Sequence, residues 1–358
     1  MQAKLIGWDI GGAHVKAALM NNEGELFSVY QEPCPLWRGL DELPRAVNAI
    51  MAKIARSKTV HVITMTGEMV DLFDNRDDGV MRIVQTMTDL FAGTRILFFA
   101  GKNGFLEGDK VTAKHYQSIA SANWMASASL AAIMQSDGLF VDCGSTTTDI
   151  LILSNGQVLA EGYTDYQRLL SHELVYTGVI RTAVMAVAQT VMDQGKQISL
   201  IAEHFATMAD VYRVTGELNE AHDQTETADG GKKTALASAR RLSRMIGCDF
   251  HTNETPRWQQ LAANLRVQQL RQIQRGCEAR LSKHQLAKDS PVIGAGVGRF
   301  LVQQIALNLN RPYVDFTDLL PFAALETDLT SADCAPAVAI AYLADKYCKG
   351  DNTASLFN

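Results

Sequence analysis

Apolar and polar positions along the first 137 residues follow two alternating spacings. Runs with strand spacing predict five strands, and helical spacing predicts three helices, the last of them buried. The predicted strands are Lys4–Ile10, Val15–Met20, Leu26–Tyr30, Thr59–Met65 and Arg95–Phe99. The predicted helices are Asp41–Ala55, Gly79–Phe91 and Tyr116–Gln135. This alternation of strands and helices indicates an α/β fold.

The strand pattern starts again at Gly138. Three further strands are predicted, again joined by a glycine-containing turn and an Asn-Gly turn: Leu139–Cys143, Asp149–Leu153 and Val158–Glu161. Asp9 and Asp142 occupy corresponding places in the two repeats. The repeat predicts an internally duplicated fold with two lobes, 1–137 and 138–358.

The region 165–288 predicts a mostly helical insertion in the second lobe. Lys232–Met245 and Trp258–Leu286 have helical spacing, and a strand at Val292 leads to a helix at Phe300–Leu307. Basic residues concentrate in these two insertion helices, for example Lys232, Lys233, Arg240, Arg241 and Arg244. Two interpretations stay open for them: a solvated helical face, or cations that contact an anionic substrate.

Composition narrows the class of protein. The 358 residues are 47% hydrophobic and 20% charged, which is typical of a globular protein, and the net charge of −6 gives no support for nucleic-acid binding. No apolar run reaches the roughly 20 residues that span a bilayer, and Trp8 and Asp9 interrupt any signal-peptide core, so we expect a cytoplasmic protein without a membrane partner. The six cysteines contain no C-x-x-C pair. Among them, Cys143 is interpreted as an apolar filler rather than a nucleophile.

The first glycine-bearing turn is Asp9–Lys16. Gly11 and Gly12 let backbone N–H groups approach an anion, and Lys16 returns a positive charge to the same region. Asp9 can hold a Mg²⁺ ion that in turn contacts phosphate. The alternative is a plain structural hairpin.

The second turn, Asp142–Asp149, carries four consecutive hydroxylated residues between two buried strands. Gly144, Ser145, Thr146 and Thr147 offer backbone amides and hydroxyls to phosphate oxygens, and Asp142 supplies a second carboxylate for the metal. We therefore expect a phosphate-binding loop here.

The third turn, Val292–Arg299, contains Gly294, Gly296 and Gly298 between a strand and a helix. It matches neither the G-x-G-x-x-G nor the P-loop pattern. A glycine-rich strand-to-helix turn suits a flat ring or a phosphate near a helix N-terminus.

Three such turns on a duplicated lobe pattern resemble the acetate kinase, sugar kinase, Hsp70 and actin (ASKHA) superfamily. The resemblance implies a duplicated actin-like ATPase, ribonuclease H-like two-lobe fold. It also implies that Asp9 and Asp142 organise Mg²⁺ in a cleft, that ATP can be a cofactor, and that Ile293–Gly298 forms the adenosine loop.

More particular stretches are similar to a hydantoinase/oxoprolinase-like branch linked with tetrahydromethanopterin-dependent one-carbon transfer. They are Thr64–Phe73, Asp142–Asp149, Thr227–Gly230 and Ala239–Asp249. Archaeal relatives in that branch act in methanofuran biosynthesis as a furan-methanamine synthase. The resemblance implies a transferase that joins an aminomethyl-furanmethyl diphosphate to the phenol oxygen of a glutamyl-tyramine or glutamyl-tyrosine and releases diphosphate.

The phosphate loops suit that chemistry, because the enzyme must neutralise a leaving diphosphate and orient a phenol. Glu68 and Asp149 are the candidates for a general base that deprotonates the phenol. Two alternatives stay open: an ATP-dependent kinase or hydantoinase/oxoprolinase-type hydrolase of the same fold, and a non-enzymatic nucleotide switch. The expected partners are small-molecule diphosphate and phenol substrates, without nucleic acid, and homodimer formation stays open.

Overall fold

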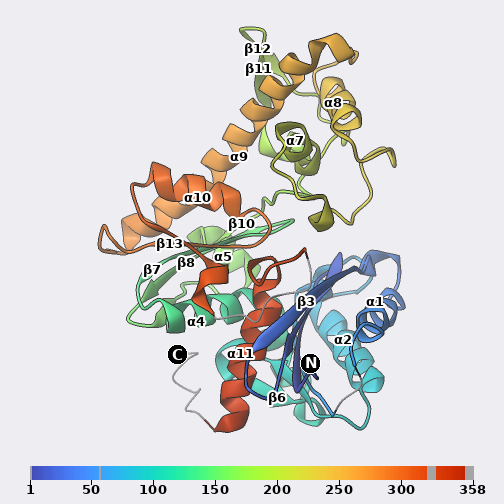
Figure 1. The fold of residues 1–358 in the computed structure, drawn as a ribbon, viewed down its shortest axis with the longest axis vertical. Coiled ribbons are helices and arrows are strands. Elements are labelled where there is room, and N and C mark those ends of the chain that lie inside the picture. The colour runs from blue at the N-terminus through green and yellow to red at the C-terminus, as the bar shows by residue number, and fades with distance from the viewer. Residues whose placement is uncertain (1, 56–57, 321–327, 351–358) are drawn as a thin grey trace. The chain divides into compact units, whose positions relative to one another are not determined.

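A six-stranded mixed sheet forms the core of the N-terminal part of the chain (Figure 1). The computed structural model describes residues 2–55, 58–320 and 328–350. The strand order is β3-β2-β1-β4-β5-β6, with β1, β2 and β3 antiparallel and β4 parallel to β1. The strands are β1 Leu5–Ile10, β2 His14–Met20, β3 Leu26–Pro33, β4 Val60–Met65, β5 Ile96–Phe99 and β6 Phe105–Glu107.

Helices pack on both faces of this sheet, and the alternation of side chains along β1 shows why. Gly7 faces α11, where a Cβ would overlap the carbonyl oxygen of Ala337, so only glycine lets the helix approach this closely. The next residue, Trp8, faces the opposite side and packs on Phe91 at the end of α2. The helices of this part are α1 Glu42–Met51, α2 Arg76–Leu90, α3 Tyr116–Ile119, α4 Asn123–Met134 and α11 Ala335–Lys349.

A second sheet repeats the arrangement of the first. Its order is β10-β8-β7-β13-β14, with β9 paired to β8. The meander β9-β8-β7 with β13 parallel to β7 therefore matches β3-β2-β1 with β4 parallel to β1. The strands are β7 Gly138–Cys143, β8 Thr148–Ser154, β9 Gln157–Leu159, β10 Leu174–Val175, β13 Val292–Ala295 and β14 Tyr313–Asp315. Asp9 and Asp142 are each the penultimate residue of their strand, which confirms the predicted duplication.

The insertion contains the long helix α9, Thr255–Lys283, with α7 and α8 packed beside it (Figure 1). Its other helices are α5 Asp165–Ser171, α6 Val184–Val187, α7 Met208–Thr215 and α8 Ala235–Arg244. A hairpin of β11 Thr190–Asp193 and β12 Lys196–Ser199 packs on α9, and α10 Arg299–Asn308 follows β13. The insertion is mostly helical as predicted, but the short strands β10, β11 and β12 were not predicted.

The chain divides into two compact units. Unit 1 comprises residues 1–138, 152–160 and 314–358, and unit 2 comprises 139–151 and 161–313. These units differ from the predicted continuous lobes 1–137 and 138–358, because α11 at the C-terminal end packs on β1 and β4 of the first sheet. Among the described residues, no helix is long and apolar enough to cross a membrane.

The single helix predicted for Tyr116–Gln135 is wrong. The segment forms α3 and α4, separated at Ser121, whose backbone adopts a left-handed conformation with φ of 49°. A continuous apolar and small-residue pattern hides this break. The break has a local consequence, because the Ser121 hydroxyl donates a hydrogen bond of 2.7 Å to Oε1 of Glu68.

A buried histidine on β4, next to β1 in the sheet, makes the stability of the first unit depend on pH. Nδ1 of His61 accepts a hydrogen bond of 3.1 Å from the Trp8 indole, and the imidazole stacks on Phe91. Burial lowers the pKa of His61 from 6.5 to about 4. The unfolded chain therefore binds a proton that the folded chain excludes, and stability is lost as the pH falls from above 6.5 towards 4.

We predict that this one group removes about 2 kcal/mol of unfolding free energy between pH 7 and pH 5. Denaturant unfolding of the wild type and of His61→Gln at both pH values measures it, since the glutamine retains an acceptor for Trp8 but does not titrate. An equal loss in both proteins would show that His61 is not the cause.

Candidate functional site

The predicted phosphate-binding loop, Gly144–Thr147, lies between β7 and β8 of unit 2. The Gly144 amide donates to the Thr147 carbonyl oxygen at 2.9 Å and closes the turn. Within the described ranges, the amides of Ser145, Thr146 and Thr147 donate no hydrogen bond to the protein. The loop thus presents three backbone donors and three hydroxyls, which is the chemistry that recognises phosphate oxygens.

A segment of the insertion, Thr177–Thr182, is hydrogen-bonded to the carbonyl oxygens of this loop. We term it the bracket segment. The amide of Val179 donates to the Gly144 carbonyl oxygen at 3.0 Å. The amides of Ile180 and Arg181 both donate to the Ser145 carbonyl oxygen, at 3.1 and 2.9 Å. These bonds satisfy the carbonyl oxygens of Gly144 and Ser145, so the bracket segment fixes the loop through its acceptors and not through its amide donors.

The third glycine-bearing turn packs directly on the second loop. Gly296 has φ of 80°, and a Cβ there would overlap the Cys143 carbonyl oxygen and Oδ1 of Asp142. The Gly298 amide donates to the same carbonyl oxygen at 2.8 Å. Gly294 lies against the Tyr313 ring. The structure therefore brings Asp142, Gly144–Thr147 and the third turn together, and all three glycines serve close packing. Their role in binding a ring stays a prediction.

The sequence analysis did not identify Arg181 as a candidate. Its Nη1 lies 3.4 Å from the Thr146 hydroxyl, and its backbone amide is fixed to Ser145, so both ends of the residue lie at the phosphate loop. Burial lowers the pKa of Arg181, but a guanidinium remains charged at neutral pH. No local spacing marks this residue, because only the fold brings position 181 beside position 146.

Cys143 lies within this group of residues. Burial is the main cause that raises the pKa of its thiol to about 12, and the nearby carboxylate of Asp142 contributes to the rise. The thiolate is the reactive form, so this environment disfavours a nucleophilic role at neutral pH. Its sulfur instead fills the space beside Gly298, as the sequence suggested.

Asp149 at the other end of the loop takes part in a buried ion pair. Its Oδ1 lies 2.7 Å from Nη2 of Arg168, which also donates to the Glu173 carbonyl oxygen. Burial raises the pKa of Asp149, and the guanidinium partly opposes that rise. This contact holds β8 to α5, a structural role that was not predicted from the sequence.

The first glycine-bearing turn lies in unit 1, next to the turn after β4. Its Gly11 amide donates to the His14 carbonyl oxygen at 2.9 Å. Gly12 packs on Val70, and Gly67 lies against the Gly11 carbonyl oxygen, so the two turns are in contact.

The predicted charges of this turn lie side by side on the sheet. Asp9 and Lys16 are cross-strand neighbours on β1 and β2. The ammonium of Lys16 donates to the Asp333 carbonyl oxygen at 2.6 Å, just before α11. Phosphate binding by Lys16, Gly11 and Gly12 stays a prediction.

Glu68 is buried in the turn after β4, with its backbone against Gly79 of α2. The hydroxyl of Ser121 donates to its Oε1. Unit 1 thus places Glu68 one residue beyond Gly67, which contacts the first glycine-bearing turn. Its catalytic role stays a prediction.

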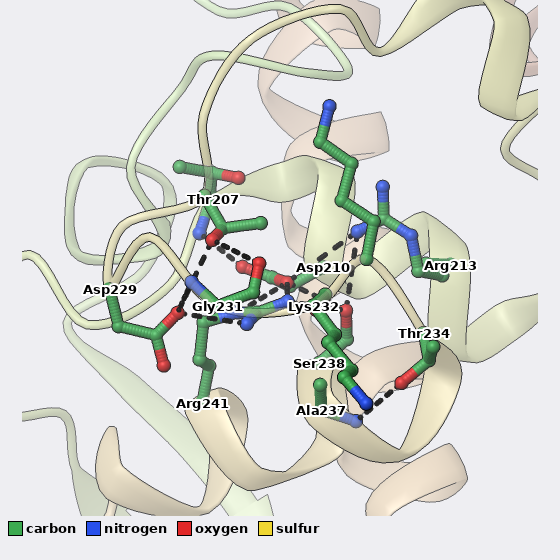
Figure 2. Close-up of polar contacts among 12 residues, drawn as sticks. Thr207, Asp210, Arg213, Asp229, Gly231, Lys232, Thr234, Ala237, Ser238 and Arg241 are labelled. Atoms are coloured by element: carbon green, nitrogen blue, oxygen red, sulfur yellow. Dashed lines mark hydrogen bonds and ion pairs between the residues drawn. The ribbon is translucent and has the colours of Figure 1, made fainter.

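Two arginines of the insertion, Arg213 and Arg241, form a buried charge network with carboxylates (Figure 2). Arg241, only 1% exposed, contacts Asp210 at 2.8 Å and Asp229 at 3.0 Å. Asp210 also accepts from Ser238, and Arg213 pairs with Glu220. A solvated helical face is therefore wrong for Arg241: buried charges persist where partners compensate them. The network ties the 227–231 loop to α7 and α8.

The carboxylates of the candidate site are also possible metal ligands. Across the residues that the structure describes, no group of three or more His, Cys, Asp or Glu side chains is placed to hold a metal. Mg²⁺, however, is commonly bound by one or two carboxylates together with substrate phosphates and waters. Asp142 lies near the end of β7, with its Oδ1 beside Gly296, and fits that pattern.

Comparison with solved structures defines the class of protein first. Nucleotide-free acetone carboxylase matches with a TM-score of 0.53 and 10% sequence identity, over 96% of this chain and 70% of that one. Together with the internal duplication, this similarity identifies the fold as the duplicated actin-like α/β fold.

The family follows from sequence. Residues 59–322 match the family model described as hydantoinase/oxoprolinase, and the chain belongs to this family of enzymes. A relative from Methanocaldococcus jannaschii, (4-{4-[2-(gamma-L-glutamylamino)ethyl]phenoxymethyl}furan-2-yl)methanamine synthase, is 30% identical over 250 residues, 70% of this chain and 73% of the relative. The Methanococcus vannielii protein of the same name is 31% identical over 113 residues, which are 32% of this chain and 50% of that protein.

We predict that Gly296→Ala disturbs Asp142 as well as stability. The matched control is Gly216→Ala, because Gly216 also has φ of 80° but has open space around it. The control should lose only the strain of a left-handed alanine, about 1–2 kcal/mol. Gly296→Ala should lose more, since the methyl group also displaces Asp142 and Cys143.

Denaturant unfolding of both variants measures this difference. Equal losses would mean that the close packing of the second and third turns contributes nothing.

Proposed function

We propose that this chain is a diphosphate-releasing transferase of methanofuran-type biosynthesis in tetrahydromethanopterin-linked one-carbon metabolism. The observation that carries the proposal is the 30% identity, over most of both chains, to a synthase named for a phenoxymethyl-furan product. A phenoxymethyl group contains an ether between a phenol oxygen and a CH₂ carbon. The enzyme that forms it must join those two atoms.

The proposed reaction balances with two substrates. The phenol oxygen of a glutamyl-tyramine or glutamyl-tyrosine bonds to the CH₂ carbon of an aminomethyl-furanmethyl diphosphate. The bond between that carbon and the diphosphate oxygen breaks, its electron pair leaves with diphosphate, and the phenol proton passes to a base. The furan ring stabilises positive charge at the CH₂ carbon as the bond breaks.

The Gly144–Thr147 loop supports the leaving-group side of this proposal. Its three amides, which have no acceptor among the residues that the structure describes, and the adjacent hydroxyls can donate to diphosphate oxygens. The guanidinium of Arg181, beside Thr146, adds a positive charge where negative charge develops. These groups are held by the bracket segment before substrate arrives, so little reorganisation is needed.

Mg²⁺ is the proposed cofactor, with Asp142 and Asp9 as its carboxylate ligands. When bound, the ion would neutralise charge on the departing diphosphate. Each carboxylate is the penultimate residue of the first strand of its own sheet, and this correspondence between the two repeats supports the proposal. ATP is the competing ligand, and we propose that substrate diphosphate takes its place in the phosphate loops.

Glu68 is the proposed general base. The ion pair of Asp149 with Arg168 commits that carboxylate to holding β8 to α5, so it is less free to turn toward a phenol. Glu68 accepts a hydrogen bond from the neutral hydroxyl of Ser121.

The ligand is identified by isothermal titration of the protein with Mg²⁺ and either inorganic diphosphate or ATP. Diphosphate should bind and ATP should bind more weakly. Tight ATP binding without diphosphate binding would overturn the proposal in favour of an ATP-dependent kinase or hydrolase.

Asp142→Ala should reduce Mg²⁺-dependent diphosphate release by roughly 10²–10³-fold, the effect typical of removing one electrostatic contact to developing charge. Phosphorus NMR with both substrates measures the release. Asp249→Ala, an exposed carboxylate on the same unit, is the control and should keep wild-type activity. Full activity of a folded Asp142→Ala protein would contradict the assignment.

Arg181→Gln should raise the dissociation constant for Mg²⁺-diphosphate by roughly 10- to 150-fold, because one charge-assisted hydrogen bond contributes about 1.5–3 kcal/mol. Arg275→Gln removes the same charge from an exposed position of α9 and controls for long-range electrostatics. Equal affinities of the two variants would show that Arg181 does not contact the anion.

A further inference from the structure

Gln269 is a buried amide in the middle of α9, with 0% of its surface exposed. Its Nε2 donates to Oγ1 of Thr177 and to the carbonyl oxygen of Gly178, both at 2.8 Å. Its Oε1 accepts a hydrogen bond from the hydroxyl of Tyr212 on α7. Each polar atom of the amide therefore has a partner, as burial in a helical core requires.

Two of these partners, Thr177 and Gly178, lie on the bracket segment, which contacts the Gly144–Thr147 loop. The carbonyl oxygen of Thr177 accepts a hydrogen bond of 2.7 Å from the Thr148 hydroxyl, at the far end of the loop. Gly178 is so close to the loop that a Cβ would overlap the amide nitrogen of Thr146 and the carbonyl oxygen of Gly144. A displacement of Thr177 or Gly178 therefore moves the loop itself.

Helix α7 fixes the other end of the bracket segment. The amides of Met208 and Ala209, in its first turn, donate to the carbonyl oxygens of Thr182 and Ile180 at 2.8 and 3.2 Å. Burial raises the pKa of Tyr212 well above its usual value, so its hydroxyl remains protonated and continues to donate to Gln269. Helices α7 and α9 thus hold both ends of the segment that carries the loop.

We propose that Gln269 and Tyr212 are positioning residues for the phosphate loop, acting through Thr177 and Gly178 to fix the Gly144–Thr147 amides for an anion. The consequence for catalysis rests on the proposed function, in which that anion is the diphosphate of the substrate. Neither residue contacts the anion itself.

The test compares Gln269→Met with Gln268→Met. Gln268 is the next residue on α9, and its Nε2 also donates to a backbone carbonyl oxygen at 2.8 Å, but that oxygen belongs to Thr190 of β11. Both variants lose a glutamine donor to the backbone, and only one of them loses a contact to the bracket segment.

Amide hydrogen exchange reports the position of the loop without any ligand. In Gln269→Met, the amides of Val179, Ile180 and Arg181 should exchange about tenfold faster, because a buried carbonyl oxygen loses its donor. In Gln268→Met those three amides should keep wild-type rates. Titration with Mg²⁺ and inorganic diphosphate should show a roughly tenfold weaker affinity for Gln269→Met alone.

Tyr212→Phe is the second test variant if Gln269→Met does not fold. It removes only the hydroxyl that donates a hydrogen bond to Gln269. It should change the same three amides and the same affinity in the same direction. Unchanged exchange and affinity in a folded Gln269→Met or Tyr212→Phe protein would overturn the positioning role. Faster exchange in a protein whose wild type binds no diphosphate would support positioning and contradict the proposed function instead.

Discussion

The hydrogen bonds from Val179, Ile180 and Arg181 to the carbonyl oxygens of Gly144 and Ser145 are the constraint on which the candidate site depends. A loop of small hydroxylated residues between two strands has few side-chain contacts of its own and would be mobile without them. By occupying its carbonyl oxygens, the bracket segment leaves its amides for an anion. The third glycine-bearing turn completes the packing, because Gly296 and Gly298 pack on Cys143, and Gly298 also contacts Val179 of the bracket segment.

The insertion therefore holds the Gly144–Thr147 loop in position, in addition to any contact that it makes with substrate. Its buried ion pairs, centred on Asp210 and Arg241, fix α7 to α8 and to the 227–231 loop (Figure 2). Such pairs contribute little net stability but strongly oppose alternative packings, since a separated buried charge is costly. The first turn of α7 is hydrogen-bonded to the bracket segment, so the position of α7 determines the position of that segment.

Much of the fold and part of the site could be predicted from sequence, for identifiable reasons. The strands around Asp9 and Asp142 are short apolar runs bounded by glycine turns, so their type, order and duplication follow from local pattern. The break at Ser121 could not be predicted, because its left-handed backbone leaves no mark in an apolar segment. Local sequence also could not predict the roles of Arg181 and Gln269 or the ion pairs of Arg241, because each depends on contacts with residues distant in sequence. The three glycines of the third turn were recognised as a unit, but their contact with Cys143 and Asp142 is a tertiary property.

The origin of the ether oxygen is the measurement that tests the central claim most directly. The protein would be supplied with Mg²⁺, the aminomethyl-furanmethyl diphosphate and a glutamyl-tyramine whose phenol carries ¹⁸O, without ATP. Mass spectrometry should find the label retained in the ether product and absent from the released diphosphate, because the phenol oxygen attacks carbon and the diphosphate leaves with its own oxygen. A product formed only when ATP is converted to ADP, or a label found in the released phosphate, would contradict the account.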